Sequence, residues 1–207
     1  MSDIEAIVIG GSAGALEALL SIMPMLPEQV LCPIVIVLHL PPAQPSHVPD
    51  ILSRVCARTV YEAEDKVPLR DQTIYVAAPN YHLLIERNRS LSLSIDEPVH
   101  HSRPAIDVLF ESAADAYGPA VAGLVLSGAN QDGAEGLYQI RQAGGMAIIQ
   151  DPATASSPIM PETAIRRVGP SAHVIRLMDL GAFFARLVCA HAEPIQGYKT
   201  RSGGFLL

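Results

Sequence analysis

The 207-residue chain has no tryptophan, and aromatic residues make up 5% of it. Its hydrophobic residues, 49% of the chain, must therefore build a core mainly from Ala, Val, Ile and Leu. No hydrophobic run reaches the roughly 18 residues of a transmembrane helix, so we expect no membrane insertion. The N-terminal MSDIEAIVIGG has no basic region before its hydrophobic run, which argues against a secretory signal.

Cysteine and positive charge are also scarce. The three cysteines, Cys32, Cys56 and Cys189, have no C-x-x-C spacing and cannot all pair within one chain. We interpret them as buried apolar residues of a protein in a reducing cytoplasm. The net charge of −7 argues against a nucleic-acid partner, because such a surface needs clustered Lys and Arg.

Metal-ligand patterns are missing as well. The adjacent His100 and His101 come without an H-x-x-x-H or carboxylate pattern. We therefore expect no metal site and interpret the two histidines as loop residues that can line a site.

Strand-like and helix-like segments alternate along the chain. The expected strands cover residues 4–9, 34–38, 59–63, 73–79, 121–128, 146–150 and 173–177, and the expected helices cover 14–23, 46–57, 104–117, 132–144, 161–167 and 180–191. Continuous β-branched runs such as IVIVL are typical of parallel strands buried on both faces. The pattern predicts a doubly wound, mainly parallel α/β sheet with helices on both faces. We assign this domain to residues 1–192 and a C-terminal extension, partly disordered, to 193–207.

The middle of the chain departs from this alternation. YHLLIER and SLSLSI read as two short strands joined by a turn at Asn88-Arg89. SLSLSI alternates cleanly, so one of its faces should meet solvent. We predict an antiparallel hairpin inserted into the otherwise parallel sheet.

The stretch AIVIGGSAGALEAL, residues 6–19, passes from a strand through glycines into a helix. Gly10, Ser12 and Gly14 match G-x-S-x-G, a turn that can expose a nucleophilic hydroxyl. Free backbone N–H groups at the start of the helix could stabilise an oxyanion or hold a phosphate. The stretch alone therefore fits two chemistries.

Three reactive residues fall at predicted strand ends. Ser12 follows the first strand, His39 ends IVIVLHL, and Asp132 follows GLVLSGANQ. Parallel strands bring such residues to one edge, where a serine, a histidine and an aspartate meet the needs of acyl transfer. The plainer alternatives are a core or loop histidine at His39 and a helix N-cap at Asp132, which is compatible with catalysis.

A nucleotide-binding domain is the main alternative for the glycine-rich turn. GGSAGA does not satisfy G-x-G-x-x-G, no Walker motif is present, and His39 stands where a ribose-binding acid belongs. A standard α/β-hydrolase also fits poorly, because its order is Ser, acid, His and its nucleophile follows a later strand.

Several blocks of sequence carry a resemblance to a known family. The principal ones are VIGGSAGALEAL, VLHLPP and LSGANQDGAEGL. The supporting ones are TIYVAAPNYHLL, HSRPAIDVLFESAA and IIQDPATASSPIMPETAI, and together the blocks run in order from about residue 4 to 180. Together they resemble the catalytic domain of chemotaxis receptor methylesterases of the CheB type. The joint order is specific, although each block is weak alone.

The resemblance implies an activity and its residues. Ser12 corresponds to the nucleophile, His39 to the general base and Asp132 to the orienting acid. Backbone N–H groups at Ala13 and near Ala129 would hold the oxyanion. The implied reaction hydrolyses γ-glutamyl methyl esters on chemoreceptors in the cytoplasm, or deamidates glutamines there, without a metal or cofactor.

Departures from the family pattern concentrate around the expected site. Ala13 stands for a frequent Thr, Ala15 for a Gly, Ala129 for a Met, and Ile159 for a Gly. The last two lie at the lip of the expected site, where a change would alter substrate choice.

Two candidate substrate contacts follow from the same resemblance. They are Arg103, for which pairing with an acid is an equal alternative, and Met160.

The sequence also lacks the receiver domain that controls response-regulator members of the family. The chain is then either a piece of a longer protein or a stand-alone member. Met1 followed by SDIEAIVIGG resembles a natural start, so we expect a stand-alone member controlled by a separate regulatory protein. Its substrate would be a methylated chemoreceptor-like protein. The alternative is a binding or regulatory module that keeps the fold and has weakened turnover.

Overall fold

A computed structural model describes residues 4–39 and 46–186 of the chain. Its main strands are β1 (Ala6–Gly11), β2 (Ile34–Leu38), β3 (Thr59–Glu62), β4 (Thr73–Val76), β7 (Val121–Val125), β8 (Met146–Gln150) and β9 (His173–Ile175). They form a seven-stranded sheet in the order β3-β4-β2-β1-β7-β8-β9, with every neighbouring pair parallel. The predicted mainly parallel α/β fold is confirmed.

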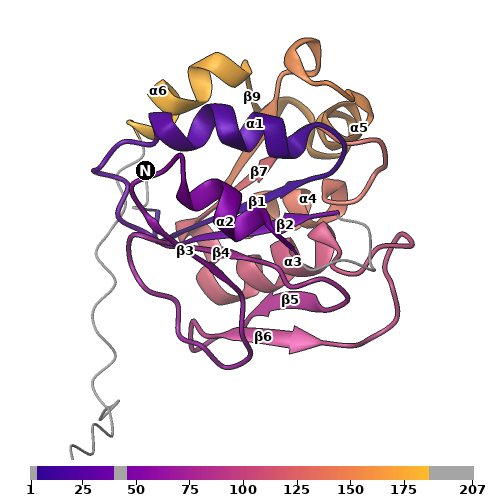
Figure 1. The fold of residues 1–207 in the computed structure, drawn as a ribbon. Coiled ribbons are helices and arrows are strands. Elements are labelled where there is room, and N and C mark those ends of the chain that lie inside the picture. Colours follow the sequence, from indigo (N-terminus) through magenta and orange to yellow (C-terminus); the bar gives the residue numbers. More distant parts are fainter. Residues whose placement is uncertain (1–3, 40–45, 187–207) are drawn as a thin grey trace, which may run out of the picture.

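Helices cover both faces of this sheet (Figure 1). One face carries α1 (Ala15–Ile22), α2 (Val48–Ser53) and α6 (Leu180–Phe184), and the other carries α3 (Ile106–Tyr117), α4 (Ala134–Gln142) and α5 (Ile159–Val168). Short 3-10 turns occupy Met23–Met25, Gly118–Ala120, Pro152–Thr154, Gly169–Ser171 and Leu177–Asp179. None of the helices in the described part is long and apolar enough to cross a membrane.

The two-residue period of the central strand divides the core. In β1, Ala6 and Val8 pack with α3, α4 and α5, whereas Ile7 and Ile9 pack with α1, α2 and α6. Successive side chains of a strand point to opposite faces, so a strand buried on both sides must be hydrophobic throughout. This explains the uninterrupted hydrophobic run in β1.

The predicted hairpin is present as β5 (His82–Ile85) and β6 (Leu91–Ser94), paired antiparallel. It forms a two-stranded sheet of its own and does not join the seven-stranded sheet. Leu83, Ile85 and Leu91 are buried in the core cluster that contains the side chains of α3. The hairpin therefore covers α3, and the insertion lies beside the parallel sheet.

Several element boundaries differ from the expected ones. The helix expected over 46–57 is limited to α2, and the one expected over 161–167 begins two residues earlier, at Ile159. Cys32 is buried as expected, but Cys56 is half-buried. The end of the helix expected over 180–191, Cys189 and the extension 193–207 lie outside the described residues.

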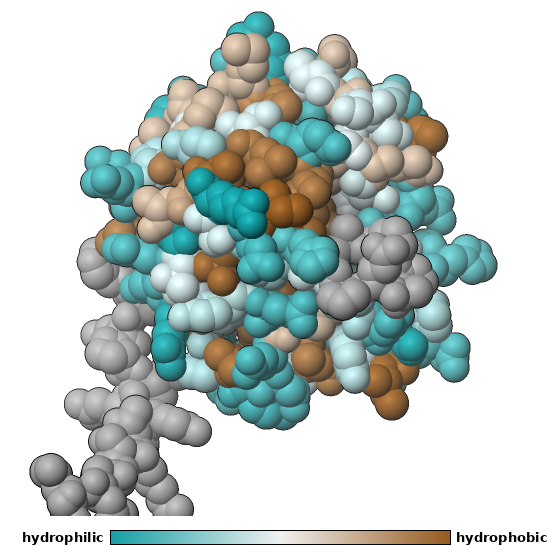
Figure 2. Space-filling view, in the orientation of Figure 1, coloured by the Kyte–Doolittle hydropathy of each residue, from teal (hydrophilic) through white to brown (hydrophobic). Residues whose placement is uncertain are grey.

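A hydrophobic patch lies on the surface between α1 and α2 (Figure 2). The half-buried hydrophobic side chains of these two helices are Leu16 and Leu20 on α1 and Ile51 on α2. Leu16 and Leu20 are four residues apart and so share one side of the helix. The patch is thus an outer continuation of the core beneath these two helices.

Candidate active site

Backbone hydrogen bonds continue beyond the carboxyl ends of the central strands. The His39 N–H donates to Gly11 O at 3.1 Å, and the Ser12 N–H donates to Ser127 O at 2.9 Å. Since Gly11 pairs with Leu38, the register extended by one residue places Ser12 opposite His39. Strand β1 is also the point where the chain order reverses, the usual position of a site in such sheets.

The turn after β1 requires its glycines. Gly14, the N-cap of α1, has a φ of 79°, and a Cβ there would lie 2.5 Å from Ser156 Cβ. A Cβ at Gly11 would lie 2.4 Å from the side chain of Ala15, which is fully buried as the first residue of α1. The methyl group of Ala15 therefore fits the turn because Gly11, which it contacts, has no side chain.

Ser127 holds the turn from behind. Its hydroxyl donates to Ala13 O at 2.6 Å and accepts from Ser157 N at 2.8 Å. The Ser127 N–H donates to the side-chain oxygen of Gln150 at 2.9 Å. These bonds join the Ser12 turn to the loop that follows β8.

His39 and Asp132 form a close pair. His39 Nε2 lies 2.8 Å from Asp132 Oδ2, and the Asp132 carboxylate is fully buried. The same carboxylate accepts from Ile106 N at 2.7 Å and from Asp107 N at 2.9 Å, the first two residues of α3. Asp132 thus caps α3 from another loop, where the helix dipole favours negative charge.

These contacts keep Asp132 ionised. Burial by itself would raise the pKa of Asp132, because a carboxylate loses its hydration. The hydrogen bonds from His39 and from the N–H groups of Asp107 and Ile106 outweigh burial, and the pKa lies below its usual value. A charged carboxylate of this kind orients a histidine ring and stabilises its cation.

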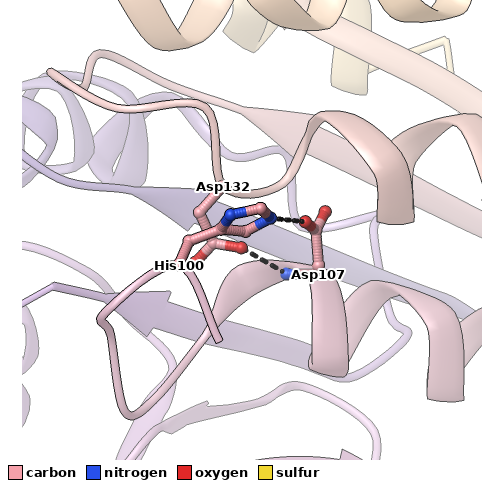
Figure 3. Close-up of side chains that lie close together, drawn as sticks. All are labelled: His100, Asp107 and Asp132. Carbon is pink, nitrogen blue, oxygen red and sulfur yellow. Dashed lines mark hydrogen bonds and ion pairs between the residues drawn. The ribbon is translucent and has the colours of Figure 1, made fainter. Parts of the chain in front are cut away.

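A second carboxylate and a second histidine, Asp107 and His100, lie next to Asp132 (Figure 3). Asp107 accepts from Gly136 N, in the first turn of α4, at 2.7 Å and lies 3.2 Å from His100 Nε2. Burial raises the pKa of Asp107 to about 6 despite the Gly136 N–H, and the Asp132 charge adds to the rise. As the pH rises, Asp132 therefore loses its proton before Asp107 does.

His100, Asp107 and Asp132 also lie as metal ligands could, with one ligand atom of each within 4.8 Å of the others. In this arrangement, however, every carboxylate oxygen of the two aspartates already has an N–H or imidazole partner. A cation would have to displace those donors from two helix N-termini. The donor set therefore fits helix capping, and we assign no metal to it.

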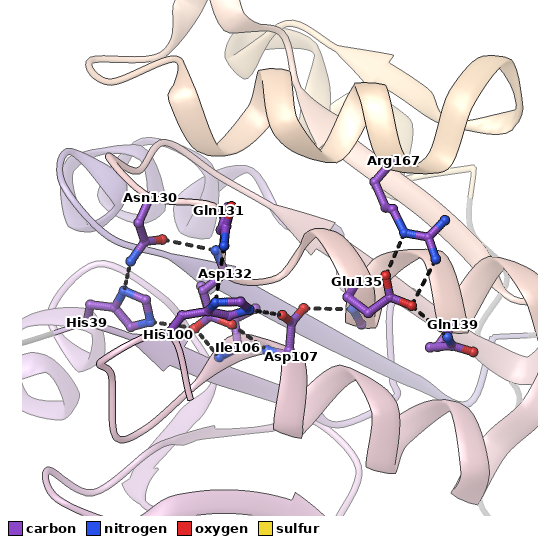
Figure 4. A network of polar contacts seen from close by, with 11 residues as sticks. His39, His100, Ile106, Asp107, Asn130, Gln131, Asp132, Glu135, Gln139 and Arg167 are labelled. Carbon is purple, nitrogen blue, oxygen red and sulfur yellow. Dashed lines mark hydrogen bonds and ion pairs between the residues drawn. The ribbon is translucent and has the colours of Figure 1, made fainter. Parts of the chain in front are cut away.

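His39 has a second polar neighbour, Asn130 (Figure 4). Asn130 Nδ2 lies 3.2 Å from His39 Nδ1, and Asn130 Oδ1 accepts from Asp132 N at 3.2 Å. Gln131, the next residue, reaches the other histidine, with Nε2 3.3 Å from His100 Nδ1. The loop before α4 thus contacts both histidines.

The structure brings Ser12, His39 and Asp132 to one edge, but the side chain of Ser12 stands apart. Among the described residues, Ser12 Oγ makes no hydrogen bond, with His39 or any other group. The N–H groups of Ala13 and Ala129 likewise have no partner in the described part of the chain. Oxyanion binding by these two N–H groups stays a prediction.

Arg103 and Met160 lie differently from the central residues. Arg103 Nη1 donates to Ile95 O at 2.8 Å and to Asp96 O at 3.0 Å, so within residues 4–39 and 46–186 its partners are backbone carbonyls and not an acid. Met160 is fully buried, and its N–H donates to Gly128 O at 2.9 Å. Substrate contact by either residue stays a prediction, and Met160 supports the Gly128 segment from beneath.

Sequence reasoning missed Ser127, Asn130 and Asp107. Each acts through long-range contacts, and none belongs to a motif of its own. A hint was present for all three, because Ser127 and Asn130 lie in the block LSGANQDG and Asp107 lies in the block RPAIDVLF, both near the expected site. The pairing of these two blocks across the α3 and α4 termini requires the folded chain.

Fold and site together define a doubly wound α/β protein in which a half-buried histidine pairs with a buried aspartate beside a serine turn, at the carboxyl edge of the sheet. The family model for the CheB methylesterase matches residues 7–184. The chain belongs to the CheB methylesterase family.

Relatives and a solved structure agree with this assignment. A Leptospira interrogans protein provisionally named protein-glutamate methylesterase/protein-glutamine glutaminase is 45% identical over 183 residues, covering 88% of this chain and 94% of the relative. A Trichodesmium erythraeum protein-glutamate methylesterase/protein-glutamine glutaminase is 37% identical over 155 residues, 73% of this chain and 44% of the relative. The crystal structure of the Thermotoga maritima CheB methylesterase catalytic domain matches 90% of this chain and 100% of that chain, with a TM-score of 0.84 and 28% identity.

Proposed function

We propose that this protein is a serine hydrolase that cleaves γ-glutamyl methyl esters on chemoreceptor-like signalling proteins and releases methanol. The observation that carries the proposal is the His39–Asp132 pair, 2.8 Å apart, one residue beyond a strand that neighbours the Ser12 turn. The names of the relatives support an ester of glutamate as substrate, and deamidation of glutamine as a second reaction.

In the proposed mechanism, His39 Nδ1 takes the proton of Ser12 as Oγ attacks the ester carbonyl. His39 Nε2 stays on Asp132 Oδ2, so the imidazolium forms beside a carboxylate that is already ionised. The N–H groups of Ala13 and Ala129 hold the oxyanion, an effect of about 3–4 kcal/mol for each good donor.

Collapse of this intermediate breaks the bond from the carbonyl carbon to the methoxy oxygen. The leaving methoxide takes the proton from His39 Nδ1 and departs as methanol. Water then attacks the acyl-serine, gives a proton to His39, and releases the glutamate side chain while Ser12 regains its proton. Glutamine reacts in the same way, with ammonia as the leaving group.

The setting of this reaction is part of the proposal. A substrate on the cytoplasmic helices of a chemoreceptor-like protein places the enzyme in the cytoplasm. A separate regulatory protein would control it.

The test measures methanol released from a methylated chemoreceptor by wild type and by Ser12→Ala. We expect the wild type to release methanol and Ser12→Ala to release it at least about 1000-fold more slowly, as for other triad serines. Ser21→Ala is the matched control, because Ser21 is exposed on α1 and its hydroxyl donates to the Glu17 carbonyl within the same helix. Equal release by wild type and Ser12→Ala would contradict the mechanism, and no release by either would favour a binding or regulatory module.

A further inference from the structure

The amide of Asn130 bridges the backbone of its own loop and the imidazole of His39 (Figure 4). Its Oδ1 accepts from Asp132 N at 3.2 Å, and its Nδ2 lies 3.2 Å from His39 Nδ1. Because a backbone N–H can only donate, the amide oxygen must face Asp132 and the amide nitrogen must face the ring. The Asp132 N–H, which cannot accept a hydrogen bond, therefore determines the orientation of the Asn130 amide.

That orientation decides the tautomer of His39. The amide NH₂ is a donor, so His39 Nδ1 must be the unprotonated acceptor. Nε2 then carries the hydrogen and donates it to Asp132 Oδ2 at 2.8 Å, where an ionised carboxylate requires a donor. Two independent contacts lead to the same neutral form, with Nδ1 as the nitrogen that can receive a proton.

Two groups therefore need the lone pair of His39 Nδ1, the hydroxyl of Ser12 and the amide of Asn130. Ser12 must give its proton to this nitrogen, yet Asn130 holds it and Ser12 Oγ has no hydrogen bond among the described residues. We propose that Asn130 is a positioning residue that caps the base nitrogen of His39 at rest, and that acylation of Ser12 requires this cap to leave. The inference rests on the proposed role of His39 as the general base.

The Asn130 amide is also incompatible with the next stage of the reaction, in which His39 is protonated. Once His39 Nδ1 is protonated, the ring nitrogen and the Asn130 amide are both donors and can no longer bond. Rotation of the amide about its last bond would offer Oδ1 to the ring but take it from Asp132 N. Departure of the whole side chain is therefore needed, and the half-buried position of Asn130 at the edge of the loop allows it.

The test follows the second-order rate of Ser12 labelling by a small fluorophosphonate across pH, using the full chain. In Asn130→Ala the base nitrogen is uncapped, and we expect labelling to become about 3- to 10-fold faster, the factor that one neutral hydrogen bond typically contributes. Asn130→Asp keeps the acceptor for Asp132 N but faces the ring with an oxygen, which favours the imidazolium. We expect this variant to label more than about 10-fold slower at neutral pH, with its acid limb shifted to higher pH.

Gln131→Ala is the matched control. Gln131 is exposed in the same loop and bonds His100, so its removal should leave the labelling rate of Ser12 unchanged. Imidazole nitrogen NMR of the wild type should report hydrogen on Nε2 and an unprotonated Nδ1. Hydrogen on Nδ1 in the neutral ring, or Asn130→Ala labelling at the wild-type rate or slower, would overturn the inference.

The experiment separates this inference from the proposed substrate, because labelling needs no receptor. Faster labelling of Asn130→Ala with no methanol released from a methylated receptor would support the role of Asn130 and contradict the proposed substrate. Absence of Ser12 labelling in every variant would overturn the cap together with the role of His39.

Discussion

The two halves of the site are built in different ways. The acid–base half, around His39 and Asp132, is held by side-chain hydrogen bonds that reach the first turns of two helices. The nucleophile half is a glycine-rich turn, held through its backbone and by Ser127, with no bond on Ser12 Oγ among the described residues. The proposed base, His39, is therefore oriented by hydrogen bonds in the free protein, whereas the position of the proposed nucleophile, Ser12, depends on the shape of the turn.

The acid–base half gains its order from crosswise capping. Asp132, just before α4, accepts from the first N–H groups of α3, and Asp107, at the start of α3, accepts from Gly136 in α4. Each carboxylate stabilises the positive end of the other helix. Gly136 permits the close approach, since a Cβ there would lie 2.6 Å from Phe110 Cβ.

A substitution at Gly14 should give the largest loss in stability, and it would break the nucleophile half. In Gly14→Ala the positive φ and the Cβ contact at 2.5 Å both oppose folding. We expect the free energy of unfolding to fall by about 3–4 kcal/mol, combining backbone strain with overpacking. Urea denaturation measures this loss.

Gly169→Ala measures backbone strain without a close contact. Gly169 has a φ of 76° and a ψ of −157°, and nothing lies within 4 Å of its Cβ position. We expect a loss of about 1–3 kcal/mol there from backbone strain. A loss at Gly14 of only about 1–2 kcal/mol, the cost of left-handed backbone by itself, would mean that the packing against Ser156 does not shape the turn.

A smaller effect is expected at Asp107 and would sharpen the view of the acid–base half. Its pKa of about 6 in the folded chain exceeds the usual 3.8, so the folded protein binds this proton more tightly than the unfolded chain. Asp107 therefore favours folding below pH about 4, and this contribution is lost as pH rises through about 6. Asp107→Asn, which keeps an acceptor for Gly136 N, should remove that dependence.

Urea denaturation from pH 4 to 8 checks this prediction. Relative to wild type, Asp107→Asn should gain about 2–3 kcal/mol in unfolding free energy between pH 4 and pH 7. The lowered pKa of Asp132 gives the opposite slope in both proteins and cancels in the difference. A pH-independent difference would show that Asp107 titrates normally and that His100 or water satisfies its charge.

Local sequence patterns were sufficient to predict individual strands and the hairpin, but not where the hairpin packs. Residues 34–38 form β2 as expected, because a continuous β-branched run ends at Pro33 on one side and at His39 on the other. The hairpin was predicted as a hairpin, but its position over α3 depends on packing by Leu83 and Ile85. Alternation of polar and hydrophobic residues does not reveal which element a strand will cover.

The candidate site followed a similar rule. Ser12, His39 and Asp132 could be found because parallel strands bring their carboxyl ends to one edge. The crosswise caps and the contact from Asn130 to His39 could not, since they join loops separated by 25 to 91 residues. Predicting them requires the relative placement of α3 and α4, which short-range periodicity does not contain.

The central claim is that His39 activates Ser12, and the most direct measurement is the rate of Ser12 modification by a fluorophosphonate in wild type and His39→Gln. Mass spectrometry of the peptides assigns the adduct. We expect the wild type to be modified at Ser12 and the rate to fall at least about 100-fold in His39→Gln, the lower range for loss of a general base. An adduct at another residue, or an equal rate at Ser12 in both proteins, would contradict the account.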